Sequence, residues 1–587
     1  KINMEMYSYG MTEFSTIFFR IARVSSSETG EAAQQRKRGN EMEGASSGGN
    51  ALTHLNSDME RPRYYLTNNV MLEAALFLAL TAFKAVQNLS SSQIGTAASG
   101  VAEKDLLGCF ALAVLYLSTA LCSSSGHLGM GYLGHKWALF ISLCGYTSFT
   151  LGNVIAAAAY HNGSSNVIWL AWVAELTGAL LCGISAAVLW PAHDAYSLQN
   201  AQGYAKANNL SDAVGFDPSS ITSRTGGGPS FTSPEAKMAA ALSAEKSSAA
   251  SSSVLFSWIF FFTFQMTGVF GNLVSSVLMT ASSEIEDNMY LLYLIYFFIA
   301  LAGTVLAALL RNPKALESSD PLAEDAQSGL VVPQLAGRGA DGVAECISGG
   351  APVCAKALVS PFTLLNPRRR MRAVRLALCI PMMLYAGCET AYFVSHFTST
   401  FIQPSLGAQS IGFIMMAFAL GSMLASIGVG VLQGVLGHAF LLALGLICHA
   451  VVLAILLFSG DKLTNPDTPK GAVWFIELLC AFLWGTGDAS LNTQLAKWLA
   501  RGDRVINKAA PSTQQREELG ALSSNLRMWQ CLCAALAFFL DPLLPGIAAT
   551  VITSVLLLLA ALLFVTAIVS KRCYDRKDAP PQHKHTD

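Results

Sequence analysis

The chain has 587 residues, of which 52% are hydrophobic and 13% are charged, and its formal net charge is −1. Soluble domains carry about 25% charged residues, mostly on their surfaces, so this composition excludes an ordinary soluble protein. The near-zero net charge also argues against a nucleic-acid partner, because domains that bind nucleic acid are usually strongly basic. The lipid bilayer is the solvent that suits so apolar a chain, and it is the first partner we expect.

Residues 1–69 precede the apolar region and are expected to form a disordered cytoplasmic tail. Within them, residues 25–62 are rich in Ser, Gly, Glu and Arg and show no periodicity. Such a segment contains too few apolar residues to form a packed core.

Twelve apolar runs follow, each close to the roughly 20 residues that a membrane-spanning helix requires. The first six are expected near residues 70–90, 106–125, 137–159, 167–190, 254–280 and 290–310. The second six are expected near residues 374–400, 408–432, 438–458, 472–497, 519–540 and 547–569. The runs therefore predict an N-terminal six-helix bundle over 70–310 and a C-terminal six-helix bundle over 373–570.

Two long polar segments interrupt these runs, and both have the composition of flexible loops. Residues 197–253 contain "TGGGPS" and "SSAASSS" and form an insert within the first bundle. Residues 311–372 contain "ESSDPLAEDAQSG" and are the expected cytoplasmic linker between the two halves. Residues 571–587 are expected to be a second disordered tail.

The positions of Lys and Arg predict how the chain is oriented, because cytoplasmic flanks carry an excess of both. With the N-terminus in the cytoplasm, the outer flanks hold only Lys104, Lys462 and Lys470. The inner flanks hold Arg61, Arg63, Lys136, Arg311, Lys314, Arg368, Arg369, Arg370, Arg372, Lys497, Arg501, Arg504, Lys571 and Arg572. Both termini are therefore expected in the cytoplasm, with the chain in the plasma membrane or an endomembrane.

A few ionisable residues lie inside the apolar runs, where a charge costs about 2.5–3.5 kcal/mol at a helix centre on insertion scales. They are Glu73, Lys84, Glu175, Glu389, Glu477, Asp488 and Arg527. Apart from Arg527, all of them lie on the first, fourth, seventh and tenth runs. Major facilitator transporters are built from triple-helix repeats nested in two halves, and the first helix of each repeat lines the central cavity. The pattern therefore predicts an all-α membrane protein with twelve transmembrane helices and the major facilitator fold.

Helical geometry groups these residues further, since positions eleven apart differ by only about 20° around the axis. Glu477 and Asp488 therefore face the same way, with Asn492 one turn beyond Asp488. Glu73 and Lys84 have the same spacing on the first run.

On the seventh run, Tyr385, Glu389 and His396 are expected to share one stripe. At about 1.5 Å per residue, we expect Lys84, Glu175 and Glu389 to meet in the outer half of a cavity, and Asp488 to lie in its inner half. Two roles remain open for these charges. They line a cavity that binds ions or protons, or they lock helices together, for example through a Lys84–Glu175 or Lys84–Glu389 bridge.

Three further features are expected to be structural. Arg527 is expected to pack or snorkel near the inner surface, and His449 to be a hydrogen-bonded core histidine. Gly430-x-x-x-Gly434 permits close helix approach, either within the chain or with a partner.

The stretch "GTGDASLNTQL" (Gly485 to Leu495) closely resembles the Gly-x-Gly-Asp-x-x-x-Asn-Thr-Gln signature of the uncoordinated-93-like family, a branch of the major facilitators. Four other stretches resemble that family in the same order: "AVQNLSSS", "FQMTGVFGNLVSS", "LYAGCETAYFVSHFT" and "NLRMWQCLCAALAFF". The resemblance covers about 70–200, 254–310 and 372–570. Residues that match its motifs on the tenth and fifth spans are Asp488, Asn492, Gln494, Gln265, Gly271 and Asn272.

The sequence departs from that resemblance at two places. The pattern Trp-x-x-Gln-Gly-x-Tyr at the end of span four reads "WPAHDAY" here, so His193 and Asp194 replace Gln and Gly. The loop after span two reads "GMGYLGHKW", with Gly131 where major facilitators carry the Asp of a gating salt bridge. Both departures weaken the case for ordinary alternating-access transport.

Members of the family are described as regulators of potassium channels or ion homeostasis, or as chaperones of receptors. The resemblance therefore implies a regulatory or trafficking subunit whose partner is a membrane channel or receptor. The alternative is a secondary transporter of ions or small solutes, with proton coupling through Glu175 and Glu389 as one option. The sequence has no nucleophile elbow, phosphate-binding glycine loop or metal constellation, so we expect no enzyme activity, no cofactor and no metal site.

Overall fold

The computed structural model of the chain describes residues 49–90, 103–123, 126–161, 165–214, 234–281, 289–311, 367–504, 512–544 and 547–577. Within these ranges the regular secondary structure is entirely helical. The remaining parts of the expected tails, insert and linker lie outside the described residues.

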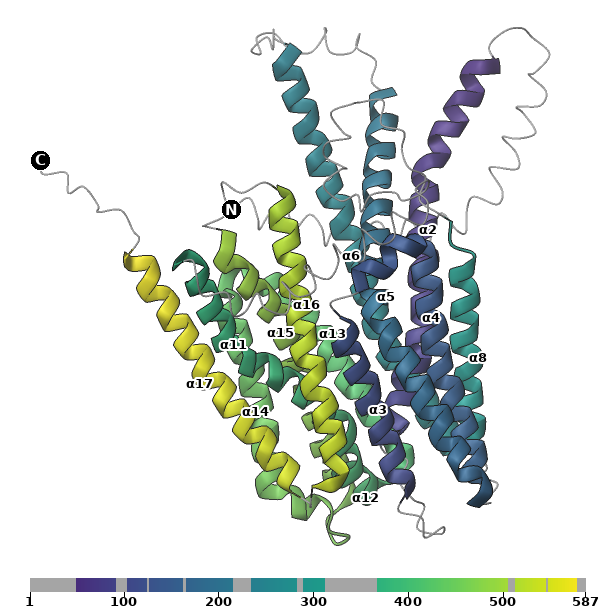
Figure 1. Cartoon of the computed structure of the whole chain (residues 1–587), viewed down its shortest axis with the longest axis vertical. Coiled ribbons are helices and arrows are strands. Elements are labelled where there is room, and N and C mark those ends of the chain that lie inside the picture. The colour runs from purple at the N-terminus through teal and green to yellow at the C-terminus, as the bar shows by residue number, and fades with distance from the viewer. Residues whose placement is uncertain are drawn as a thin grey trace, which may run out of the picture.

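The first half of the chain forms six helices, which lie on the right-hand side of Figure 1. They are α2 (Gly49–Ser90), α3 (Glu103–Cys122), α4 (Gly126–His161), α5 (Ser165–Val214), α6 (Pro234–Ala281) and α8 (Met289–Ala308). Helix α4 packs along α5 and α8, and α2 packs against α8 and α6. These contacts make the six helices one bundle.

The second half forms the other bundle. Its first span is composite and consists of α11 (Pro367–Ala391), the π-helix η3 (Tyr392–Ile402) and α12 (Gln403–Leu406), followed by the short η4 (Ala408–Ser410). The others are α13 (Ile411–Leu436), α14 (His438–Leu463), α15 (Lys470–Arg504), α16 (Ser512–Leu540) with η6 (Asp541–Leu543), and α17 (Ala548–Lys577). Helices α13 and α14 pack on α15, and α11 packs on α16 and α17.

Length and composition suit these helices to a bilayer. Eleven described helices are long and apolar enough to cross a membrane, and Leu106–Cys122 is a shorter apolar helix that supplies the twelfth span. Large apolar side chains are exposed on the outside of the bundle, for example Phe458 at 84% and Val435 at 72%. A water-facing surface would not carry so many of them, so these side chains face lipid. The expectation of an all-helical membrane fold with twelve spans is confirmed.

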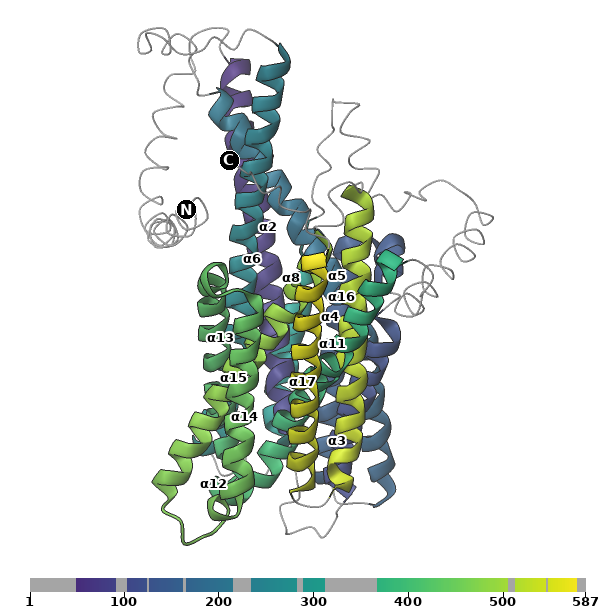
Figure 2. The ribbon, with the colours of Figure 1, turned by 90° about the vertical axis from the view of Figure 1, so that its left-hand side faces the viewer.

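Several helices are longer than the apolar runs that predicted them. Helices α2, α5 and α6 extend past the bundle at the end where α2 begins and α17 ends, which we call the terminal end (Figures 1 and 2). Residues 49–69, 197–214 and 234–253, expected as tail and insert, are therefore helical. The segment that begins α6 is rich in Ala, the best helix former, and Pro234 occupies its first position, where proline is favoured.

The two halves meet along two pairs of helices. Helix α3 packs on α16, where Phe110 stacks on Phe539 with ring centroids 5.2 Å apart and Tyr116 stacks on Phe538 at 5.4 Å. On another side of the molecule α6 packs on α13, where Gln265 Nε2 donates a hydrogen bond to Ser422 Oγ at 3.0 Å. The interface between the bundles is thus formed by two pairs of spans. The second span (α3) packs on the eleventh (α16), and the fifth (α6) packs on the eighth (α13).

Candidate functional site

Three charged side chains from three helices interact at the centre of the molecule. Lys84 comes from α2 in the first half, and Glu389 on α11 and Asp488 on α15 come from the second half. The Glu389 and Asp488 carboxyl groups are neighbours that interact electrostatically, and Asp488 also interacts electrostatically with Lys84. We call these three residues the central cluster.

An aromatic pocket surrounds Glu389, which is 1% exposed. Trp484 Nε1 donates a hydrogen bond to Glu389 Oε2 at 2.8 Å, and His449 Nε2 lies 3.9 Å from the same oxygen. His449 Nε2 is 3.0 Å from the Trp484 carbonyl oxygen, and its Nδ1 is 2.8 Å from the Tyr385 hydroxyl. Since a carbonyl only accepts, Nε2 carries the hydrogen and Nδ1 accepts from Tyr385. The expectation that His449 is a hydrogen-bonded core histidine is confirmed.

Lys84 lies on the opposite side of the cluster, against α6. Its Nζ donates to the Phe264 carbonyl oxygen at 3.3 Å and sits 3.9 Å from the centroid of the Phe264 ring. A ring face stabilises a nearby ammonium group through its negative quadrupole. Lys84 thus contacts a helix of its own bundle and interacts electrostatically with an acidic residue of the other bundle.

Two side-chain amides extend a hydrogen-bond chain from Asp488 toward the terminal end. Asn492 Nδ2 donates to Asp488 Oδ1 at 2.6 Å, and Gln530 Nε2 donates to Asn492 Oδ1 at 3.0 Å. Asn492 is exposed although it touches the partly buried Asp488. Nearby on α16, the exposed Arg527 guanidinium lies 5.5 Å from the Trp190 ring of α5, which agrees with a packing role. The hydrogen-bonded amides therefore link Asp488 of the cluster to an exposed side chain.

The two glycines of the "GTGD" stretch let α15 approach its neighbours. A Cβ atom at Gly485 would lie 2.0 Å from the Phe418 carbonyl oxygen of α13. A Cβ atom at Gly487 would lie 2.4 Å from His449 Nε2 of α14. Only glycine fits such separations, so the motif combines close helix packing with the placement of Asp488 toward Lys84 and Glu389.

The structure separates two other acidic candidates from the central cluster. Glu175 on α5 is 5% exposed, its Oε1 has no hydrogen-bond partner among the described residues, and it interacts electrostatically with Tyr293 of α8. Gly152 of α4 packs on the Glu175 backbone, so these contacts of Glu175 lie within the first bundle. The expected meeting of Glu175 with Lys84 and Glu389, and the Lys84–Glu175 bridge, therefore do not occur.

Glu477 lies near the opposite end of the bundle, which we call the loop end. It accepts a hydrogen bond from Ser405 Oγ at 2.7 Å. Although Glu477 and Asp488 share a face of α15, their eleven-residue spacing places them about 16 Å apart along the axis.

The other motif residues have packing roles. Gln494 pairs with His438 of α14. Asn272 Oδ1 accepts from Asn88 Nδ2 at 2.8 Å, and a Cβ atom at Gly271 would lie 2.5 Å from the Thr81 carbonyl oxygen. Together with the Gln265–Ser422 hydrogen bond, these contacts fix α6 between α2 and α13.

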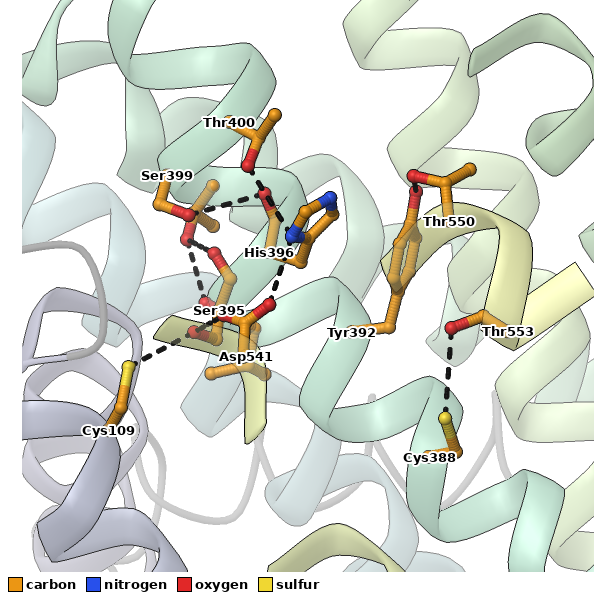
Figure 3. Close-up of polar contacts among 12 residues, drawn as sticks. Cys109, Cys388, Tyr392, Ser395, His396, Ser399, Thr400, Asp541, Thr550 and Thr553 are labelled. Carbon is orange, nitrogen blue, oxygen red and sulfur yellow. Dashed lines mark hydrogen bonds and ion pairs between the residues drawn. The ribbon is translucent and has the colours of Figure 1, made fainter. Parts of the chain in front are cut away.

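A second polar cluster, which sequence reasoning missed, lies at the loop end (Figure 3). His396 Nδ1 is 2.9 Å from Asp541 Oδ1, and Ser395 Oγ donates to Asp541 Oδ2. Cys109 Sγ of α3 lies 3.3 Å from Ser395 Oγ, so the cluster also joins the two halves. Asp541 was missed because it falls between two apolar runs; the Asp-Pro pair that ends α16 was the available signal.

The geometry of two six-helix halves, with charges of the first, seventh and tenth spans converging between them, defines a membrane protein of major facilitator type. Solved transporters share this fold. A peptide transporter POT in complex with sulfate is 13% identical, with a TM-score of 0.52 over 87% of this chain and 95% of that chain. A POT family transporter in complex with 5-aminolevulinic acid is 11% identical, with a TM-score of 0.52 over 86% of this chain and 96% of that one.

The family model described as ion channel regulatory protein UNC-93 matches residues 238–565, and the chain therefore belongs to the UNC-93 family. It is 25% identical to protein unc-93 homolog A of Bos taurus, over 81% of this chain and 86% of the relative. It is 22% identical to UNC93-like protein 3 of Arabidopsis thaliana, over 80% and 79% respectively. It is also 23% identical to the putative potassium channel regulatory protein unc-93 of Caenorhabditis elegans, over 81% of this chain and 57% of the relative.

Proposed function

We propose that the protein acts within the bilayer as a regulatory or trafficking subunit of a membrane channel or receptor, with a role in potassium homeostasis. One observation carries the proposal: the ion channel regulatory family model matches the part of the chain that holds Glu389, Asp488 and their aromatic pocket. The name of the Caenorhabditis elegans relative supports a potassium channel as the partner class. The family model and the Caenorhabditis elegans relative are both named as regulatory proteins, which supports a role without catalysis.

The central cluster suits a scaffold that holds one arrangement of its halves. Lys84 from the first half interacts electrostatically with Asp488 from the second, and Glu389 accepts a hydrogen bond from Trp484. A buried charge whose partner is removed is strongly destabilising, so separation of the halves at this point is costly. Gly131, which stands in place of the gating carboxylate, also supports a scaffold role, because a regulatory subunit does not need the gating salt bridge.

We also propose that both termini lie in the cytoplasm. The terminal end carries most of the Lys and Arg that flank the spans, and the loop end carries Lys104, Lys462 and Lys470. This asymmetry is the one expected for a cytoplasmic terminal end in the plasma membrane or an endomembrane.

Crosslinking with mass spectrometry in native membranes tests the proposal, combined with recordings of potassium current. We expect a channel or receptor to be crosslinked to the protein, and the current to change when the protein is removed. Asp488→Asn is expected to reduce that effect, whereas Gly428→Ala, at a glycine with no described atom within 4 Å, is the control. Absence of any membrane partner, together with solute flux by the purified protein in liposomes, would contradict the proposal.

A secondary transporter is the alternative, and the exposure of Asn492 favours it. A solute that enters from the terminal end would reach Asn492 first and then Asp488, its hydrogen-bond partner. If this alternative holds, pH-driven uptake into liposomes disappears in Glu389→Gln, because that variant lacks the ionisable partner of Asp488. Unchanged uptake in Glu389→Gln would remove the carboxyl pair from the mechanism.

A further inference from the structure

A histidine near the terminal end of the first bundle lies between two carboxyl groups. His193 Nε2 on α5 is 3.0 Å from Glu73 Oε1 on α2, and His193 Nδ1 is 3.2 Å from Asp194 Oδ1. The side chains of His193 and Glu73 are 3% and 4% exposed, whereas that of Asp194 is 82% exposed. The imidazole ring thus connects a carboxyl group in solvent with a buried one.

The charged groups that act most strongly on His193 are these two carboxyl groups. Helix α2 contributes Glu73, and α5 itself contributes Asp194. Helix α6 contributes the uncharged Phe260, whose ring centroid is 4.3 Å from that of His193. The Arg527 guanidinium of α16 packs over Trp190, on the preceding turn of α5.

We propose that Asp194, His193 and Glu73 form a proton-binding site that loads the buried Glu73 from the water at the terminal end. In its first state both carboxyl groups are ionised and the imidazolium donates from both nitrogens. The proton on Nε2 then moves along the 3.0 Å hydrogen bond to Glu73 Oε1, which leaves neutral Glu73 and an imidazole that keeps its hydrogen on Nδ1. Rotation or tautomerisation of the ring, followed by uptake of a proton delivered through Asp194, restores the imidazolium.

The surroundings of Glu73 support its role as the proton acceptor. Its second oxygen, Oε2, is buried and has no hydrogen-bond partner among the described residues. An ionised carboxylate with one unsatisfied buried oxygen is costly, and protonation removes the charge that makes it so.

The site lies on the same helix as Lys84 of the central cluster, about 16 Å away along the axis of α2. Glu73 and Lys84 lie on the same face of α2, since eleven residues return to nearly the same angle. On α6, the Phe260 ring contacts the His193 ring, and the ring centroids of Phe260 and Phe264 are 5.7 Å apart. The Phe264 ring in turn contacts Lys84. Protonation of Glu73 therefore removes a negative charge from the face of α2 that also carries Lys84.

Infrared difference spectroscopy after a pH jump, on the full chain in lipid nanodiscs, tests this proposal. We expect a protonated carboxyl band that is lost in Glu73→Gln and retained in Glu477→Gln, a buried carboxyl at the loop end. The band should form more slowly in Asp194→Asn, a solvent-exposed substitution that leaves the fold intact. It should be lost in His193→Ala on the same timescale and be restored by added imidazole.

His396→Gln is the matched histidine control, because His396 also pairs with an aspartate but lies at the loop end. It is expected to leave the band and its rate unchanged. A band that persists in Glu73→Gln would overturn the assignment to Glu73. Formation in His193→Ala at the same rate as in the unaltered protein, with or without imidazole, would overturn the relay through His193.

Discussion

At the scale of single residues, the glycines of the tenth span make the charged site possible. Gly485 and Gly487 bring α15 within backbone contact of α13 and α14, and this approach positions Asp488 and Trp484 around Glu389. A glycine in a membrane helix is often read as flexibility. Here the distances show that its missing side chain is what the packing requires.

Gly485→Ala is therefore expected to lower the free energy of unfolding by about 1–3 kcal/mol, because the added methyl group overlaps the Phe418 carbonyl and forces the backbones apart. Chemical unfolding in detergent micelles measures the loss. Gly428→Ala is the matched control, since no described atom lies within 4 Å of a Cβ there. Equal effects of the two substitutions would contradict the close approach at Gly485.

Trp484→Phe is expected to cost about 1–3 kcal/mol, because it leaves a buried carboxyl oxygen of Glu389 without its donor. The shift in thermal unfolding measures this cost. Trp498→Phe is the comparison, because the Trp498 ring packs edge-on against Phe564. A similar loss in both variants would show that ring volume, rather than the hydrogen bond to Glu389, dominates.

At the scale of the helix, the seventh span shows where periodicity fails as a guide. Tyr385, Glu389 and His396 were expected on one stripe, which assumes an uninterrupted α-helix. The π-helix Tyr392–Ile402 has wider i→i+5 turns, so the angle changes after residue 391. As a result, Tyr385 and Glu389 face His449, whereas His396 faces Asp541. The amino-acid composition of this segment did not predict the π-helix.

The eighth span shows a different limit. Gly430 and Gly434 fit a small-xxx-small pattern, and packing within the chain was one interpretation of it. No described atom lies within 4 Å of a Cβ at either position, so packing within the described part of the chain does not explain them. The pattern indicates that close approach is possible, whereas only coordinates show whether it occurs.

The loop-end cluster allows a direct test of how α3 and the π-helix are arranged. Ser395→Cys is expected to form a disulfide with the native Cys109 under mild oxidation, because the two side-chain ends are 3.3 Å apart. A protease site inserted between α8 and α11 would leave the two halves joined on a non-reducing gel. Thr398→Cys, one turn away on the same element, is the control and should not crosslink. Failure of Ser395→Cys to crosslink would contradict the contact between α3 and the π-helix.

At the scale of the whole molecule, the sequence was sufficient for the architecture. Twelve apolar runs, a polar segment in the middle and charges on every third span predicted two six-helix halves, and the helices and the similar fold of solved structures confirm them. The physical reason is strong: bilayer thickness sets helix length, and the cost of buried charge restricts ionisable residues to the helices that face the interior.

The partners of those charges were harder to predict. Helical angles gave the face on which Glu175 lies, but not whether that face meets the other half or a neighbour in its own bundle. Rotation of α5 against α4 decides this, through contacts such as Gly152 on the Glu175 backbone. His193 was recognised only as a departure from the family pattern; its pairing with Glu73 depends on how α2 and α5 pack.

Lys84 and Asp488 interact across the two halves, and a double-mutant cycle measures the coupling free energy between them most directly. The free energy of unfolding would be determined for the unaltered protein, Lys84→Gln, Asp488→Asn and the double variant, with Lys84→Gln and Glu477→Gln as the control pair. We expect a coupling energy of about 0.5–3 kcal/mol for the first pair. Additivity of Lys84→Gln and Asp488→Asn to within about 0.5 kcal/mol would contradict the account.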